Sequence, residues 1–147
     1  AGLKPIHVEG ATGLPDTNYA GKVNAAIEQL QEKDFVYLHI EAIDEMGHTG
    51  IPEKKIAALE DFDSKVVKPI LKSEEKFDNN LKIAILPDHS TPCKIRTHSS
   101  EPVPFVIYNP QILPDIEKNR IYSENSGKEG ELGLIPNGEE FMKIFLT

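Results

Sequence analysis

The chain has 147 residues, of which 39% are hydrophobic, a content that suits one globular domain and excludes a largely disordered chain. Its net charge is −8 and its 16 Lys and Arg residues are dispersed, which argues against a nucleic-acid partner. A single cysteine and the lack of a secretory or transmembrane pattern predict a cytoplasmic protein with no membrane partner.

The first part of the chain predicts a strand, a turn and an amphipathic helix. "KPIHVEG", residues 4–10, alternates in the manner of a short strand and ends in a glycine. Residues 16–33 predict a helix with Asp16 or Thr17 as its N-cap. Its apolar side chains recur every three or four positions, so one face of this helix should cover a sheet.

Two apolar runs predict neighbouring strands of that sheet. "FVYLHIEA", residues 35–42, and "LKIAIL", residues 81–86, carry apolar side chains on both alternating faces, as a parallel strand covered on both sides requires. Between them, residues 51–72 predict a second helix with Pro52 in its first turn. Pro69 should kink or end this helix, because an interior proline costs about 3 kcal/mol.

The last third of the chain predicts less regular structure. "VPFVIY", residues 103–108, reads as a further strand, and residues 109–136 are interpreted mainly as loop because Gly, Pro, Asn and Glu are frequent there. Residues 137–146 predict a closing helix capped by Asn137. Alternating strands and helices predict an α/β fold: a mostly parallel sheet with helices on both faces.

An acid and an imidazole follow each of the two central predicted strands. Asp44 and His48 lie in "IDEMGHTG", and Asp88 and His89 lie in "PDHSTP", with His98 further on. Ligands of open α/β sheets bind beyond the carboxyl ends of the strands, and carboxylates with imidazoles suit Mn²⁺, Mg²⁺ or Zn²⁺. Adjacent residues such as Asp88 and His89 point in different directions, so each can serve one of two metals about 3.5–4 Å apart.

The residues alone leave open a plainer interpretation of each pair, in which Asp is a turn residue and His a hydrogen-bonding group. Other nearby residues are assigned such plainer roles. His7 and His39, within predicted strands, are interpreted as core or supporting residues, and Cys93 as a small buried thiol. Ser90 and Thr91 are interpreted as turn or N-cap residues, because no base follows them in a triad arrangement.

Three stretches, in order, resemble a known family. "GATGLPDTNYAGK" (10–22), "DFVYLHIEAIDEMGHTG" (34–50) and "LPDHSTPCKIRTHSSEPVPFVIY" (86–108) are similar to the C-terminal part of cofactor-independent (2,3-bisphosphoglycerate-independent) phosphoglycerate mutases of the archaeal-type branch. That family belongs to the alkaline phosphatase superfamily, which shares the logic of these motifs with phosphopentomutases and other phosphotransferases. The resemblance covers most of residues 10–108.

The resemblance implies a site with two divalent metal ions, Mn²⁺ first, with Mg²⁺ or Zn²⁺ as alternatives. Asp44, His48 and His98 would bind one metal, while Asp88 and His89 would contribute to the other. The family completes its site with an aspartate and a nucleophilic serine near its N-terminus, so we expect no catalytic residue in this chain. In the glycolytic reaction, that serine would take the phosphoryl group of 3-phosphoglycerate and return it to form 2-phosphoglycerate.

The resemblance also predicts that residues 1–147 are the C-terminal part of the metal-binding, phosphatase-like domain. The chain begins with Ala1 instead of Met, and its sheet would lack the N-terminal strands. The predicted partners are therefore a small phosphorylated substrate and the missing N-terminal part of the same protein, without which the isomerase would be inactive. The alternatives are another metal-dependent phosphotransferase or phosphohydrolase of this superfamily, and a metal-binding module without catalysis.

Overall fold

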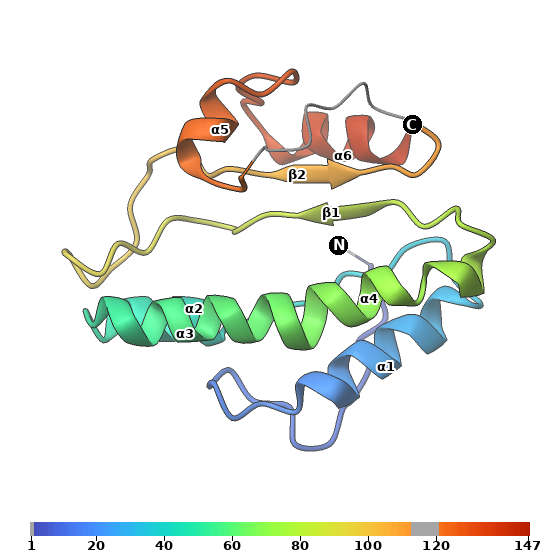
Figure 1. Ribbon diagram of the computed structural model, residues 1–147, viewed down its shortest axis with the longest axis horizontal. Helices are drawn as coiled ribbons and strands as arrows, with labels where there is room; N and C mark the ends of the chain where they lie inside the picture. The colour runs from blue at the N-terminus through green and yellow to red at the C-terminus, as the bar shows by residue number, and fades with distance from the viewer. Residues whose placement is uncertain (1, 113–120) are drawn as a thin grey trace. The chain divides into compact units, whose positions relative to one another are not determined.

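A computed structural model describes residues 2–112 and 121–147, which divide into two compact units (Figure 1). The first unit runs to Asp78 and also includes Thr91–Thr97; the second comprises Asn79–Ser90 and His98–Thr147. The segment Thr91–Thr97, which contains part of the second predicted motif, therefore belongs to the first unit.

Helix α1 (Tyr19–Leu30) opens the first unit, one or more residues later than the sequence predicts. Its N-cap is Asn18, whose side chain accepts a hydrogen bond from the Gly21 N–H at 2.8 Å and donates one to the Glu9 carbonyl at 2.9 Å. The predicted caps Asp16 and Thr17 are wrong, because both side chains instead accept hydrogen bonds from Thr12 in the preceding loop.

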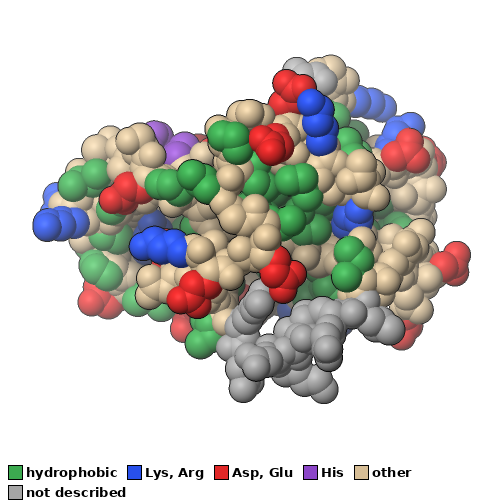
Figure 2. Space-filling model, turned by 90° about the horizontal axis from the view of Figure 1, so that it is seen from above, with side chains coloured by type: hydrophobic (Ala, Val, Ile, Leu, Met, Phe, Trp, Pro, Cys, Tyr) green, Lys and Arg blue, Asp and Glu red, His purple; other side chains and the backbone are tan. Residues whose placement is uncertain are grey.

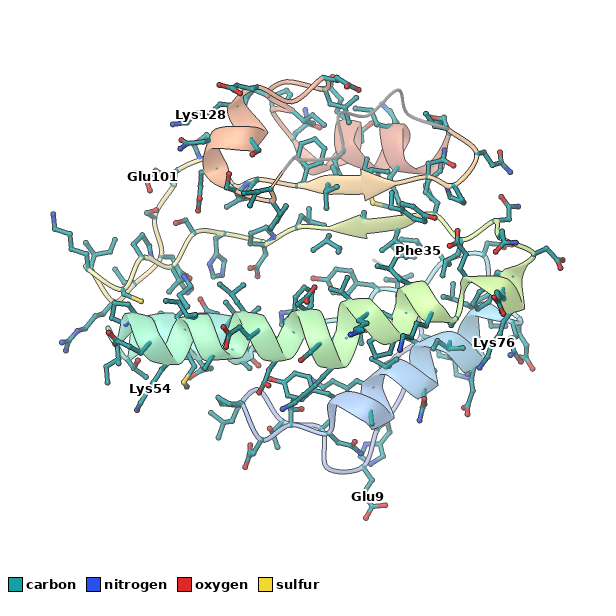
Figure 3. The ribbon with its side chains drawn as sticks, viewed as in Figure 1. Glu9, Phe35, Lys54, Lys76, Glu101 and Lys128 are labelled. Atoms are coloured by element: carbon teal, nitrogen blue, oxygen red, sulfur yellow. The ribbon has the colours of Figure 1, made fainter. Side chains whose placement is uncertain are left out.

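The second predicted helix forms a longer helical run than expected. It comprises α3 (Pro52–Phe62), the π-helical η1 (Asp63–Val67), α4 (Lys68–Lys72) and the 3₁₀ turn η2 (Glu74–Phe77). Pro52 lies at the start of α3, as predicted. Figure 3 labels Lys54 in the first turn of α3 and Lys76 in η2, which mark the two ends of this run.

Pro69 does not end the helix but follows a widened turn. In η1 the Lys68 N–H donates to the Asp63 carbonyl, five residues back instead of four. A proline has no N–H to offer, and its ring crowds the carbonyl four residues earlier, which here belongs to Lys65. A π turn just before Pro69 relieves both problems locally, and the chain stays helical to Lys72.

The core of the first unit lies between α1 and the end of this helical run. Its buried residues are Tyr19, Val23, Ile27 and Val66. Five partly buried residues pack against them: Leu38, Ile40, Phe62, Ile70 and Phe77. In Figure 1, α1 lies beside α4, in agreement with their contacts in the structure.

The strand predicted over residues 35–42 is wrong in two respects. Residues 35–41 join no ladder among the described residues, Glu41 already has helical backbone angles, and Ala42 begins helix α2 (Ala42–His48). Leu38 and Ile40 contact the core, whereas Tyr37 is 62% exposed, so only one face is buried. An apolar run indicates that a segment is buried, but it does not indicate whether another strand lies beside the segment and pairs with it.

The second unit contains β1 (Ile83–Ile85) and β2 (Val106–Tyr108), which lie within the predicted strands 81–86 and 103–108. They pair antiparallel, with Ile83 opposite Tyr108. Within the described ranges this is the one ladder of named strands, so the predicted mostly parallel sheet is not confirmed. The direction of pairing depends on how the connection between strands returns, and the apolar pattern of each strand carries no signal for that.

Two short helices complete the second unit. Helix α6 (Gly138–Leu146) begins after Asn137, whose side chain accepts from the Glu140 N–H at 2.9 Å, so the predicted closing helix and its cap are confirmed. Helix α5 (Glu124–Lys128), capped by Ser123, lies in the stretch 109–136 that was interpreted mainly as loop. Residues 113–120 of that stretch lie outside the described residues.

The second unit keeps much apolar surface exposed. None of the residues of α6 is fully buried, although Phe105 meets Phe141 edge to face with ring centroids 5.4 Å apart. Leu134 is 76% exposed and Ile121 is 75% exposed. Figure 2 shows hydrophobic side chains gathered among charged ones on one face of the molecule. This unit therefore has a shallower core than the first.

The cap of α1 yields a test of the fold. Replacing Asn18 by alanine removes the acceptor for the Gly21 N–H and the donor to Glu9, and we expect it to lower the free energy of unfolding by about 1 kcal/mol. Asn18→Asp keeps the acceptor and should lower the free energy of unfolding by less than Asn18→Ala does. Urea denaturation of the two variants measures both effects, and an aspartate variant less stable than the alanine variant would contradict this account of the cap.

Candidate metal centre

Asp44 and His48 lie on one face of helix α2, one turn apart. The sequence pattern predicts them just beyond the end of a strand, whereas the structure places both in a helix, where residues four apart are neighbours. His48 Nε2 lies 3.1 Å from Asp44 Oδ2. In the sequence, the four-residue spacing of Asp44 and His48 is the signal that could have indicated this helix.

The other nitrogen of His48 is held by the backbone. His48 Nδ1 lies 3.0 Å from the carbonyl oxygen of Arg96, in the segment Thr91–Thr97 of the same unit. Because a carbonyl only accepts, Nδ1 carries the proton, and in the neutral ring Nε2 then presents its lone pair toward the carboxylate. A nitrogen lone pair and a carboxylate oxygen repel each other at this distance unless a positive charge lies between them. The pair therefore fits either a proton or a metal ion, and this arrangement of a backbone-held histidine is usual in metal sites.

The Arg96 carbonyl also affects the protonation of His48. Its hydrogen bond is the largest cause that raises the pKa of His48 above the usual 6.5, and the charges of Asp44 and Glu45 act in the same direction. Partial burial opposes this shift. Without a metal, the site therefore attracts a proton more strongly than a free imidazole does.

Thr91 was not singled out as a site residue, yet it contacts Asp44 directly. Its hydroxyl donates a hydrogen bond to Asp44 Oδ1, and its side chain is almost fully buried, with 3% of the residue exposed. Thr91 is therefore neither a turn residue nor an N-cap, contrary to the sequence interpretation. A threonine three residues after an acid is too common to have revealed this contact.

Asp88, His89 and His98 gather in the second unit. His89 Nε2 lies 3.4 Å from Asp88 Oδ2, and the rings of His89 and His98 lie 3.7 Å apart, centroid to centroid, at an angle of 30°. A backbone bridge between Ser90 and Ser99, with the Ser99 N–H 2.9 Å from the Ser90 carbonyl, draws the two histidines together. The backbone of Ser90 thus forms one side of the bridge.

The five predicted ligands are divided between the two units. Asp44 and His48 belong to the first, and Asp88, His89 and His98 belong to the second. The segment Thr91–Thr97 contacts Asp44 and His48, and along the chain His89 precedes this segment by two residues and His98 follows it directly.

The remaining candidates lie apart from these contacts. His39 stacks on Tyr37 with ring centroids 6.2 Å apart and is exposed, so of its two predicted roles it is not a core residue, and the role of a supporting residue stays a prediction. His7 is likewise exposed. Cys93 is a free, half-buried cysteine.

Within the part of the chain that the structure describes, no helix has the length and apolar character needed to span a membrane.

Known proteins similar to this chain include a 2,3-bisphosphoglycerate-independent phosphoglycerate mutase of Methanosarcina mazei. That protein is 50% identical over 135 residues, which are 92% of this chain and 34% of the relative. A probable mutase of the same name from Geobacter sulfurreducens is 50% identical over 99% of this chain and 36% of its own length. The chain thus spans about a third of these curated relatives.

A solved structure is also similar. The PH0037 protein from Pyrococcus horikoshii matches with a TM-score of 0.83 and 33% sequence identity, over 99% of this chain and 42% of that one. The family model described as the metalloenzyme superfamily matches residues 1–146. Because this match covers nearly the whole sequence, the chain belongs to the metalloenzyme superfamily.

Proposed function

We propose that residues 1–147 are the metal-binding C-terminal part of a 2,3-bisphosphoglycerate-independent phosphoglycerate mutase, which interconverts 3-phosphoglycerate and 2-phosphoglycerate in the cytoplasm. The observation that carries this proposal is 50% identity to the Methanosarcina mazei mutase over 92% of the chain. The chemistry of the site supports it, because an Asp44–His48 pair with its second nitrogen held by a carbonyl fits a divalent cation.

The proposed roles follow from the side chains that the chain itself supplies. Asp44 offers Oδ2 and His48 offers Nε2 to one divalent ion, with His98 as its third ligand. Asp88 and His89 contribute to a second ion. Two divalent ions, Mn²⁺ first among them, would supply positive charge that stabilises a phosphoryl group during its transfer. The serine that accepts this group would come from the N-terminal part of the protein.

A second candidate is another metal-dependent phosphotransferase or phosphohydrolase. The matched family model is named for the superfamily as a whole, which favours metal chemistry without choosing the substrate. Residues that select 3-phosphoglycerate would lie largely outside these 147 residues. Assaying the full-length protein with 3-phosphoglycerate and with simple phosphate esters decides between the two.

The mutase proposal predicts that the 147-residue chain is inactive by itself. A covalent route cannot proceed without its nucleophile, whatever metals are bound. With added Mn²⁺, an assay coupled to the formation of 2-phosphoglycerate should give background rates for the chain and turnover for the full-length protein. Turnover by the chain alone would contradict the proposed division of the site.

Metal binding should weaken as the pH falls. A histidine ligates only when neutral, and the raised pKa of His48 means that protons begin to compete above pH 6.5. Calorimetric titration with Mn²⁺ should therefore show an affinity at pH 5.5 roughly tenfold or more below that at pH 7.5. Equal affinities at the two pH values would exclude ligation by His48.

The two proposed metals should differ in affinity for this chain. Asp44, His48 and His98 form a three-ligand set within it, whereas Asp88 and His89 would need ligands from the N-terminal part. In titrations of the folded chain with Mn²⁺, His48→Ala should abolish the tighter site, and His89→Ala should leave it within a few-fold of the parent. The reverse pattern would show that the ligands are assigned to the wrong metals.

A further inference from the structure

Thr91 lies beside the proposed metal ligands, and both its side-chain hydroxyl and its backbone carbonyl make hydrogen bonds. Its hydroxyl donates to Asp44 Oδ1, and its backbone carbonyl accepts a hydrogen bond from Lys55 Nζ at 2.7 Å. Lys55 lies on α3, Asp44 on α2, and all three residues belong to the first unit. Helix α3 thereby fixes the backbone of the residue that holds the carboxylate.

Close packing leaves Thr91 little freedom to move. A Cβ built on Gly47 of α2 would lie 2.8 Å from the Thr91 carbonyl oxygen and 3.0 Å from its Cγ2, so only glycine lets Thr91 come this near. With 3% of Thr91 exposed, water has little access to replace its hydroxyl. The hydrogen bond to Asp44 is therefore part of a packed arrangement and not a chance surface contact.

The two oxygens of Asp44 consequently have different neighbours. Oδ1 accepts from the Thr91 hydroxyl, while Oδ2 lies 3.1 Å from His48 Nε2. The final torsion of an aspartate side chain is soft and nearly two-fold, so without a fixed donor the two oxygens exchange roles easily. A donor at Oδ1 selects the orientation in which Oδ2 stands beside the imidazole nitrogen.

We propose that Thr91 is a positioning residue that turns Asp44 so that Oδ2 faces the metal, and that Lys55 keeps Thr91 in place. This inference rests on the proposed metal site but not on the identity of the substrate. Thr91 acts through Asp44 and is not itself a ligand. Outer partners of metal ligands typically contribute about 10–100-fold to metal affinity, which sets the size of the expected effect.

The test is Mn²⁺ affinity of the full-length protein, measured by calorimetry, together with the melting temperature of each metal-free variant. Thr91→Val removes the hydroxyl and keeps the shape, and it should weaken Mn²⁺ binding about tenfold or more. Thr91→Ser restores the donor and should bind within about threefold of the parent. The electron paramagnetic resonance spectrum of bound Mn²⁺ should change in the valine variant and stay as in the parent in the serine variant.

Lys55 provides a second, independent variant should Thr91→Val not fold. Lys55→Met removes the bond to the Thr91 carbonyl and should also weaken Mn²⁺ binding, whereas Lys55→Arg keeps a donor and should weaken it less. Lys54→Met is the matched control, because Lys54 is an exposed neighbour on the same helix (Figure 3) and its loss removes the same charge. Lys54→Met should bind Mn²⁺ as the parent does.

Three outcomes would overturn the proposal. They are parent-like affinity in both Thr91→Val and Lys55→Met, a serine variant as weak as the valine variant, and melting temperatures that fall while affinity and spectrum stay unchanged. Absence of Mn²⁺ binding by the parent would overturn it together with the proposed metal site. If the parent binds Mn²⁺ but lacks mutase activity, while Thr91→Val still weakens binding, the proposed function fails and the positioning role stands.

Discussion

The site depends on how the segment Thr91–Thr97 docks on helix α2. Two hydrogen bonds fasten it, one from the Thr91 hydroxyl to Asp44 and one between His48 Nδ1 and the Arg96 carbonyl. One bond ends on Asp44 and the other on His48, and the atoms of these side chains that the two bonds leave unused, Asp44 Oδ2 and His48 Nε2, face each other. The contact that fixes the segment therefore also sets the orientation of the two side chains proposed as ligands, and glycine at position 47 makes the close approach possible.

The same segment links this pair to the remaining histidines through the chain. His89 comes just before it and His98 just after it, and the bridge between Ser90 and Ser99 closes the loop at its base. The bridge at its base and its hydrogen bonds to Asp44 and His48 reduce the conformational freedom of this loop. Such preorganisation is a general requirement for a precise metal site.

The sequence predicted the features of this protein that depend on local chemistry. The closing helix after Asn137 and the helix that begins at Pro52 follow from caps and periodicity, which act within a few residues. The strand at residues 35–42 and the parallel sheet were not recovered, because pairing depends on segments that are distant in the chain. The residues Asp44 and His48 could be selected by type and spacing, but Thr91, Lys55 and the Arg96 carbonyl act through tertiary contacts that no local pattern records.

The π-helical turn at Asp63–Val67 changes which neighbour each half of the long helical run can meet. Helix α3 packs against α2, whereas η1 and α4 pack against α1. A π turn accommodates one extra residue, and each residue of a regular helix advances the surface by about 100°. The π turn therefore changes the direction in which the residues after it face, so that the two parts of the helical run can pack against different helices. Deleting a single residue there would restore the regular helical repeat except for the hydrogen bond that Pro69 cannot donate, and it would rotate Ile70 away from the core that it now shares with Val23.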